Sequence, residues 1–122
     1  RIGNRTNIQD GSVVHVTRET HPTIIGDDVS VGHNATLHGC TVHDNVLIGM
    51  GAIVMDDVVI ESNSIVGAGA VVTKGTHIKS GCVYAGNPAK KIKEVGKDLL
   101  EGEINRIADS YVMYSGWYSK SE

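Results

Sequence analysis

Residues 42–78 read VHDNVL-IGMGAI-VMDDVV-IESNSI-VGAGAV-VTKGTH-I, so a branched aliphatic residue opens every group of six. Earlier parts of the chain continue this spacing with two breaks, and thirteen branched aliphatic positions follow it in all: Ile2, Ile8, Val14, Ile25, Val31, Leu37, Val42, Ile48, Val54, Ile60, Val66, Val72 and Ile78. A second position, four residues further on, is small or β-branched: Thr6, Ser12, Val29, Ala35, Val46, Ala52, Val58, Ser64, Ala70, Thr76 and Cys82. A fixed short period predicts a solenoid, in which each strand buries its inward side chains by stacking on the next coil.

Within each group of six, inward and outward positions alternate, and the groups are separated by turns rich in Gly, Asn and Asp. This pattern predicts short strands joined by tight corners. Glycine directly follows the aliphatic residue in several groups, at Gly3, Gly26, Gly32, Gly49 and Gly67. We therefore expect an all-β solenoid over residues 1–95: a parallel β-helix with three groups of six in each triangular coil.

The C-terminal segment, residues 96–122, has helical spacing instead. One apolar stripe is formed by Leu100, Ile104, Ile107, Ala108 and Tyr111. Such a stripe needs a surface, so we expect a C-terminal α-helix that packs on the solenoid or on a neighbouring subunit. The basic stretch at residues 90–93, which leads into this segment, is expected to be solvated.

Two histidines have a separation that follows the coil. His15 and His38 are 23 residues apart, as expected for equivalent positions when a coil of 18 residues carries a five-residue insertion in the loop at residues 17–22. Neighbouring parallel strands lie roughly 4.8 Å apart. Two outward imidazoles on such strands can converge on one ion at about 2.0–2.1 Å each.

A third histidine, His33, comes one group earlier and is expected on a different face of the coil, where a neighbouring subunit could bring it to His15 and His38. The same count puts Gln9 and Asp10 on the face of His33, with Asp10 one coil below it. Gln9 and Asp10 could instead only form a turn. Three neutral imidazole nitrogens with an open fourth position are typical of a catalytic zinc, so the sequence predicts a metal site shared between subunits.

Three segments, NIQDG (7–11), VGHNA (31–35) and LHGC (37–40), resemble the γ-class carbonic anhydrase family and its bacterial homologues. A fourth, YAGNPAK (84–90), is similar to the end of the β-helix in hexapeptide-repeat proteins generally. The resemblance covers nearly the whole chain. It implies a left-handed β-helix that forms a homotrimer with a C-terminal helix.

The resemblance also implies a site at the subunit interface. His15, His33 and His38 would bind zinc, or iron or cobalt in its place. Gln9 would orient the water or bicarbonate at the metal, and Asp10 would anchor the surroundings of the ligands. In relatives a tyrosine of the C-terminal helix can approach the metal, which makes Tyr111 a further candidate.

Two features depart from the family pattern. The family has further N-terminal coils, so we expect this chain, which starts at Arg1, to be a fragment or a shortened member. The loop that carries a proton-shuttling glutamate in the family is short here, and Glu19 and His21 are the candidates for that role.

Composition points to one domain in a reducing compartment, and we expect the cytoplasm. The net charge of −3 gives no reason to expect nucleic acid or an anionic membrane as a partner. No apolar run is long enough to span a bilayer. Cys40 and Cys82 occupy inward repeat positions several strands apart, so buried thiols are expected rather than a disulfide.

The sequence therefore predicts an enzyme that hydrates carbon dioxide reversibly with zinc at a trimer interface. The alternatives are a metal-dependent acyl-CoA thioesterase and a non-catalytic metal-binding scaffold subunit. Hexapeptide acyltransferases share the fold but use a catalytic histidine without three histidines in metal geometry, so they fit less well.

Overall fold

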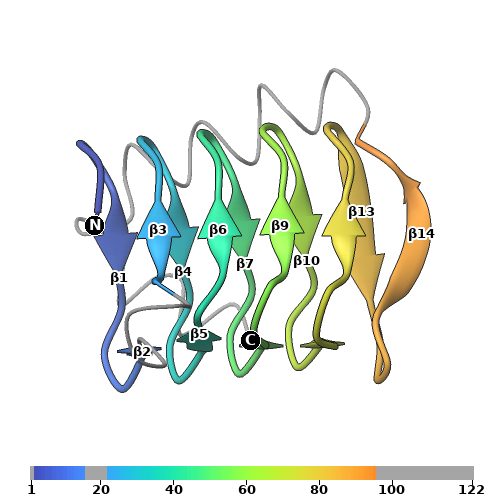
Figure 1. Ribbon diagram of the computed structural model, residues 1–122, viewed down its shortest axis with the longest axis horizontal. Helices are drawn as coiled ribbons and strands as arrows, with labels where there is room; N and C mark the ends of the chain where they lie inside the picture. Colours follow the sequence, from blue (N-terminus) through green and yellow to red (C-terminus); the bar gives the residue numbers. More distant parts are fainter. Residues whose placement is uncertain (1, 16–21, 96–122) are drawn as a thin grey trace, which may run out of the picture.

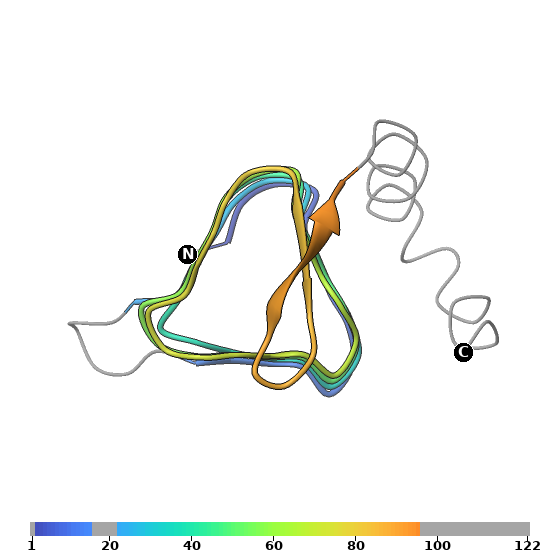
Figure 2. The same ribbon diagram turned by 90° about the vertical axis from the view of Figure 1, so that its right-hand side faces the viewer.

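The structure is a computed structural model that describes residues 2–15 and 22–95 of the 122-residue chain. Short strands stack along one axis (Figure 1), and the view down that axis shows a triangular coil (Figure 2). The strands are β1 (Asn7–Ile8), β2 (Val13–His15), β3 (Ile24–Ile25), β4 (Ser30–Val31), β5 (Thr36–His38), β6 (Thr41–Val42), β7 (Leu47–Ile48), β8 (Ile53–Val54), β9 (Val59–Ile60), β10 (Ile65–Val66), β11 (Val71–Val72), β12 (His77–Ile78), β13 (Cys82–Ala85) and β14 (Lys90–Glu94). The predicted parallel β-helix of hexapeptide repeats is confirmed.

Three sheets form the sides of the triangle. Sheet I has the strand order β1-β4-β7-β10-β13-β14, sheet II β11-β8-β5-β2, and sheet III β12-β9-β6-β3. Apart from the last pair of sheet I, all neighbouring strands are parallel. Because the chain visits the sheets in turn, each strand pairs with the strand of the next coil.

The register between coils confirms the count made from the sequence. Val14 pairs with Leu37 and Ile8 pairs with Val31, which is a separation of 23 residues in both sheets. The next coil is one residue short of 18, because Leu37 pairs with Val54. From there Val54 pairs with Val72, and the separation is 18. The second break in the repeat therefore shortens one coil without disturbing the inward positions.

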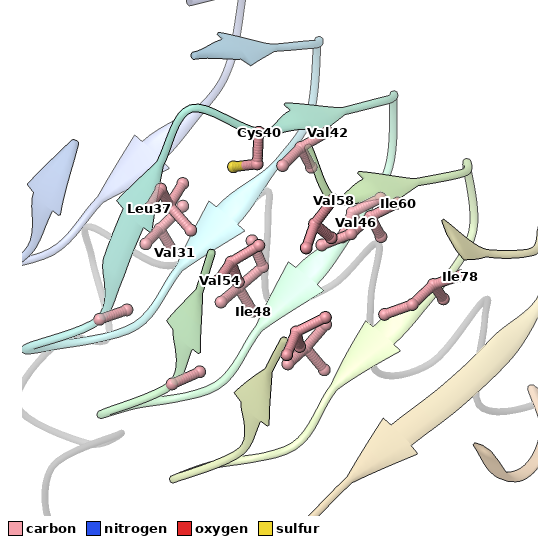
Figure 3. Close-up of a cluster of buried hydrophobic side chains, with 14 of the residues drawn as sticks. Val31, Leu37, Cys40, Val42, Val46, Ile48, Val54, Val58, Ile60 and Ile78 are labelled. Carbon is pink, nitrogen blue, oxygen red and sulfur yellow. The ribbon is translucent and has the colours of Figure 1, made fainter. Parts of the chain in front are cut away.

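The core is a column of branched aliphatic side chains (Figure 3). The inward positions from Ile25 to Ile78 are almost fully buried, whereas Ile2 in the first described coil is 51% exposed. Burying one such side chain stabilises the fold by about 1.5–3 kcal/mol. Cys40 and Cys82 are buried free thiols, as predicted, and burial raises the pKa of the Cys40 thiol to about 11.

Two glycines that follow strands of sheet I, Gly32 and Gly49, lie where adjacent coils approach closely. A Cβ added at Gly32 would lie 2.7 Å from the backbone nitrogen of Met50, and one added at Gly49 would lie 2.5 Å from the backbone nitrogen of Ala68. Neither glycine has a positive φ. These glycines are therefore required by coil-to-coil distance and not by backbone conformation.

The repeat ends in an antiparallel hairpin. β13 turns back into β14, with Cys82 opposite Glu94 and Ala85 opposite Lys90. Every residue of β14 is exposed, which agrees with the expected solvation of its lysines. The expected helix at 96–122 lies outside the described residues. The part of the chain that the structure describes contains no helix able to cross a membrane.

Candidate metal centre

His15 and His38 end adjacent strands of sheet II. His15 closes β2, His38 closes β5, and the two residues are direct partners in the parallel register. This is the placement that the 23-residue separation predicts. Adjacent parallel strands are roughly 4.8 Å apart, so the backbones of these two residues lie side by side.

His33 lies at a different corner. It sits in the turn between β4 of sheet I and β5 of sheet II, whereas His38 stands at the far end of β5, where the chain turns toward sheet III. His33 and His38 are five residues apart, and five residues of fully extended chain span at most about 18 Å. Among the described residues, no three His, Cys, Asp or Glu side chains gather around a common point. That one metal ion joins all three histidines, across copies of the chain, stays a prediction.

The ring of His33 carries a polar atom that the fold leaves unsatisfied. Its Nε2 is buried, and no hydrogen-bond partner is found for it among the described residues. The Oγ of Ser30, on β4 just before this turn, is buried and unpartnered in the same way within the described part of the chain. Buried polar atoms almost always have a partner. The described part of the chain supplies no such partner for either atom.

His38 is oriented by a carboxylate that sequence reasoning missed. Its Nδ1 lies 2.6 Å from Oδ1 of Asp56, which follows β8 in the next coil. Asp56 comes 18 residues after His38, but this coil is one residue short of 18, so Asp56 lies one position beyond the residue equivalent to His38. The backbone beside the ring is also fixed, because the N–H of Gly39 donates to the buried Oγ1 of Thr23 at 2.8 Å.

Gln9 and Asp10 lie one coil below His33, as predicted. The pairing of Ile8 with Val31 carries over to Asp10 and His33, and the Asn34 N–H donates to the Asp10 carbonyl at 3.1 Å. Gln9 is half-buried, and its N–H donates to the Val31 carbonyl at 3.0 Å. These backbone bonds show that both residues build the corner. Their roles toward a metal stay predictions.

Tyr111, Glu19 and His21 lie outside the described residues. His43 and His77 are exposed on sheet III, where His77 pairs through Nε2 with Glu61, and neither lies on the sheet that carries His15 and His38.

The donor set suits a borderline metal ion. Three imidazoles from two corners match the ligand preference of zinc and of divalent iron or cobalt. A carboxylate on Nδ1 of His38 is the contact that commonly holds the second nitrogen of a metal-binding histidine. The residues present therefore fit the metal that the sequence implies.

Comparison with known proteins first identifies the structural class of this chain. Residues 39–74 match the family described as "bacterial transferase hexapeptide (six repeats)", and residues 22–55 match the "hexapeptide repeat of succinyl-transferase". The solved structure of a hexapeptide transferase family protein from Anaplasma phagocytophilum superimposes with a TM-score of 0.85 at 39% identity, covering 96% of this chain and 68% of that one. The chain is thus a hexapeptide-repeat β-helix protein.

Proteins with similar sequences indicate which family of this structural class the chain belongs to. The chain is 45% identical to "Probable carbonic anhydrase" of Methanocaldococcus jannaschii, over 93% of this chain and 68% of the relative. It is 43% identical to "Protein YrdA" of Escherichia coli (strain K12), over 97% and 67%. It is 49% identical to "Gamma carbonic anhydrase 1, mitochondrial" of Arabidopsis thaliana, over 93% of this chain and 42% of the relative. The chain belongs to the γ-class carbonic anhydrase family, and it spans about two-fifths of the length of its Arabidopsis relatives.

Proposed function

We propose that this protein catalyses the reversible hydration of carbon dioxide to bicarbonate at a zinc site shared between the subunits of a homotrimer. The observation that carries the proposal is the division of the three histidines between two corners of the coil. His15 and His38 stand side by side at one end of sheet II, and His33 stands at the other with Nε2 buried and without a partner among the described residues. The carbonic anhydrase names of several relatives support the reaction.

The division of ligands favours a ring of subunits. A contact that joins one corner of a copy to a different corner of the next is heterologous, and such contacts form a closed ring when the rotation between copies closes. In a ring of three, each copy would give His15 and His38 to one site and His33 to another. Exposed apolar side chains lie on the sheet II face beside these residues, at Val13, Ile53 and Met55. Their burial would help to hold the copies together.

The residues of the chain would divide the chemistry as follows. His15, His33 and His38 hold the ion as neutral imidazoles. Zinc bound there would supply a water acidic enough to ionise near neutral pH and act as the nucleophile. Gln9, fixed at the corner below His33, is suited to hold the oxygen of the nucleophile or of bicarbonate through its side-chain amide. Asp10 would steady the same corner.

A second candidate is chemistry on an acyl-CoA thioester, with the same ion and the same residues. Acyl-group chemistry on this fold is supported by a similar solved structure, a "putative acetyltransferase" from Bacillus cereus that is 34% identical with a TM-score of 0.83 over 97% of this chain and 67% of that one. A metal-binding subunit without activity is the third. The cytoplasmic location stays a prediction, and the Arabidopsis relatives are named as mitochondrial proteins.

Three assays separate these functions. Stopped-flow proton release on mixing with carbon dioxide is expected for the zinc-loaded protein and is expected to be lost in His33→Ala. His43→Ala removes an exposed histidine of sheet III and should leave the rate unchanged. Release of free CoA from acyl-CoA without carbon dioxide hydration would favour the thioesterase. Bound metal without either reaction would favour the scaffold and refute the proposal.

A further inference from the structure

Asp56 and His38 form a short contact beside the candidate ligands. Oδ1 of Asp56 lies 2.6 Å from Nδ1 of His38, and the side chains are 23% and 37% exposed. A carboxylate can only accept a hydrogen bond, so Nδ1 must carry the proton. Short contacts of this type between an imidazole and a carboxylate are charge-assisted and stronger than neutral ones.

The backbone that carries Asp56 is held from both sides along the solenoid axis. The Gly75 N–H, one coil further on, donates to the Asp56 carbonyl at 3.0 Å. The N–H of the next residue, Asp57, donates to the Gly39 carbonyl in the preceding coil, also at 3.0 Å. Asp56 therefore stands on backbone that both neighbouring coils fix, and its side chain is a suitable rigid support for a ring.

The order of the strands shows from which side Asp56 approaches His38. In sheet II, β5 lies between β2 and β8. His15 ends β2, whereas Asp56 follows β8, so the carboxylate approaches His38 from the side away from His15. An ion shared with His15 would lie on the other side. The ring nitrogen for it would be Nε2, because Nδ1 faces Asp56.

We propose that Asp56 is a positioning residue for the metal centre: it holds His38 in the Nδ1–H form and in one ring rotation, so that Nε2 binds the ion. The inference rests on the proposed function, because it concerns the same site. Carboxylates that hold the second nitrogen of a metal-binding histidine raise metal affinity about 10- to 100-fold. A half-exposed ion pair with no link to a metal would add little to stability and nothing to metal affinity.

The chain offers a matched control. Glu61 and His77 form a second imidazole–carboxylate pair, on sheet III, with more exposed side chains (38% and 53%). His77 does not lie on the sheet of the candidate ligands. Glu61→Gln removes a carboxylate from a histidine just as Asp56→Asn does, so it reports what such a loss does by itself.

The first test is cobalt binding followed by the visible absorption of the ion. Asp56→Ala should weaken cobalt binding about 10- to 100-fold. Asp56→Asn should lose less, because the amide oxygen can still accept from Nδ1. Glu61→Gln should bind as the unaltered protein does. Equal affinities in the unaltered protein and in Asp56→Ala would overturn the inference and leave the proposed function intact, whereas a failure of the unaltered protein to bind would remove both.

The second test needs no metal. A long-range proton–nitrogen NMR spectrum of the metal-free protein, at mildly alkaline pH where imidazoles are neutral, identifies the protonated nitrogen of each ring. His38 should be protonated on Nδ1 in the unaltered protein and should shift toward the Nε2–H form in Asp56→Ala. A proton on Nε2 of His38 in the unaltered protein would overturn the inference whatever the metal does.

Discussion

Replacing Gly32 by alanine tests whether coil-to-coil contact sets the stability of this solenoid. The added Cβ would lie 2.7 Å from the Met50 nitrogen and 3.0 Å from the Gly49 carbonyl carbon. Ordinary contact begins at 3.4 Å, so the coils would have to separate locally by about 0.7 Å. The atoms that the added Cβ would meet belong to the backbone. The Gly32 N–H also donates a 2.8 Å hydrogen bond to the Ile48 carbonyl of the neighbouring coil, which ties the two coils together at this residue.

The expected cost follows from two opposing effects. Overpacking of this kind costs about 1–3 kcal/mol. Loss of glycine freedom in the unfolded chain offsets about 0.4–1 kcal/mol of that cost. We expect Gly32→Ala to lower the free energy of unfolding by about 1–2 kcal/mol. The measurement is urea unfolding at a fixed protein concentration, with the midpoint lowered and the slope unchanged.

Gly67→Ala is the matched control. Gly67 occupies the same position of the repeat and also lacks a positive φ, but its added Cβ would meet only the side-chain Cβ of Ala85 at 3.0 Å, with the nearest backbone atom at 3.6 Å. We expect its stability to stay within about 0.5 kcal/mol of the unaltered protein. Equal losses in Gly32→Ala and Gly67→Ala, or no loss in Gly32→Ala, would show that coil spacing does not limit these positions.

Substitutions at three further positions have defined expected outcomes. Burial raises the pKa of the Cys40 thiol from 9.0 to about 11. The stability that depends on the protonated thiol is therefore complete below pH 9 and is lost as the pH rises to about 11. Urea unfolding should show the free energy of unfolding fall by up to about 2–3 kcal/mol over this range, and the fall should be missing in Cys40→Ala. The hydrogen bond from Arg5 lowers the pKa of Asp28, so the stability from this carboxylate is present above its ordinary pKa of 3.8 and is lost as the pH falls below it. Asp28→Asn, which tolerates the φ of +56°, should cost about 1 kcal/mol or less at neutral pH and nothing in strong acid, and a constant difference across pH would contradict this. Ile60→Ala, at a fully buried inward position, should cost about 2–5 kcal/mol in urea unfolding, whereas Ile60→Val should cost about 0.5–1.5 kcal/mol; equal costs would argue against close packing of the core.

Much of the fold follows from spacing alone. The aliphatic residue at every sixth position predicts the inward column, and the interval from Val14 to Ile25 predicts the coil that makes His15 and His38 partners. A period is a global property of the chain, so it survives local irregularities. The placement of the two histidines could be predicted for the same reason.

Other features could not be read from the period. One coil is a residue short of 18, so Leu37 pairs with Val54 and not with Met55. Asp56 then lies one position beyond the residue equivalent to His38, and from there its carboxylate reaches the His38 ring. The β14 hairpin has no six-residue signal, since its residues are all exposed. The recurring glycines could be seen in the sequence, but their cause is an interatomic distance and appears only in three dimensions.

Complementation between two inactive proteins tests the shared site most directly. Each of His33→Ala and His38→Ala should bind no cobalt alone, but the two unfolded and refolded together at equal amounts should regain about a quarter of the sites, because a random ring then joins an intact His15–His38 corner to an intact His33 at that frequency. His15→Ala refolded with His38→Ala, which damages the same corner in every copy, should regain nothing. No recovery in the first mixture, or equal recovery in both, would contradict a metal site built between copies of this chain.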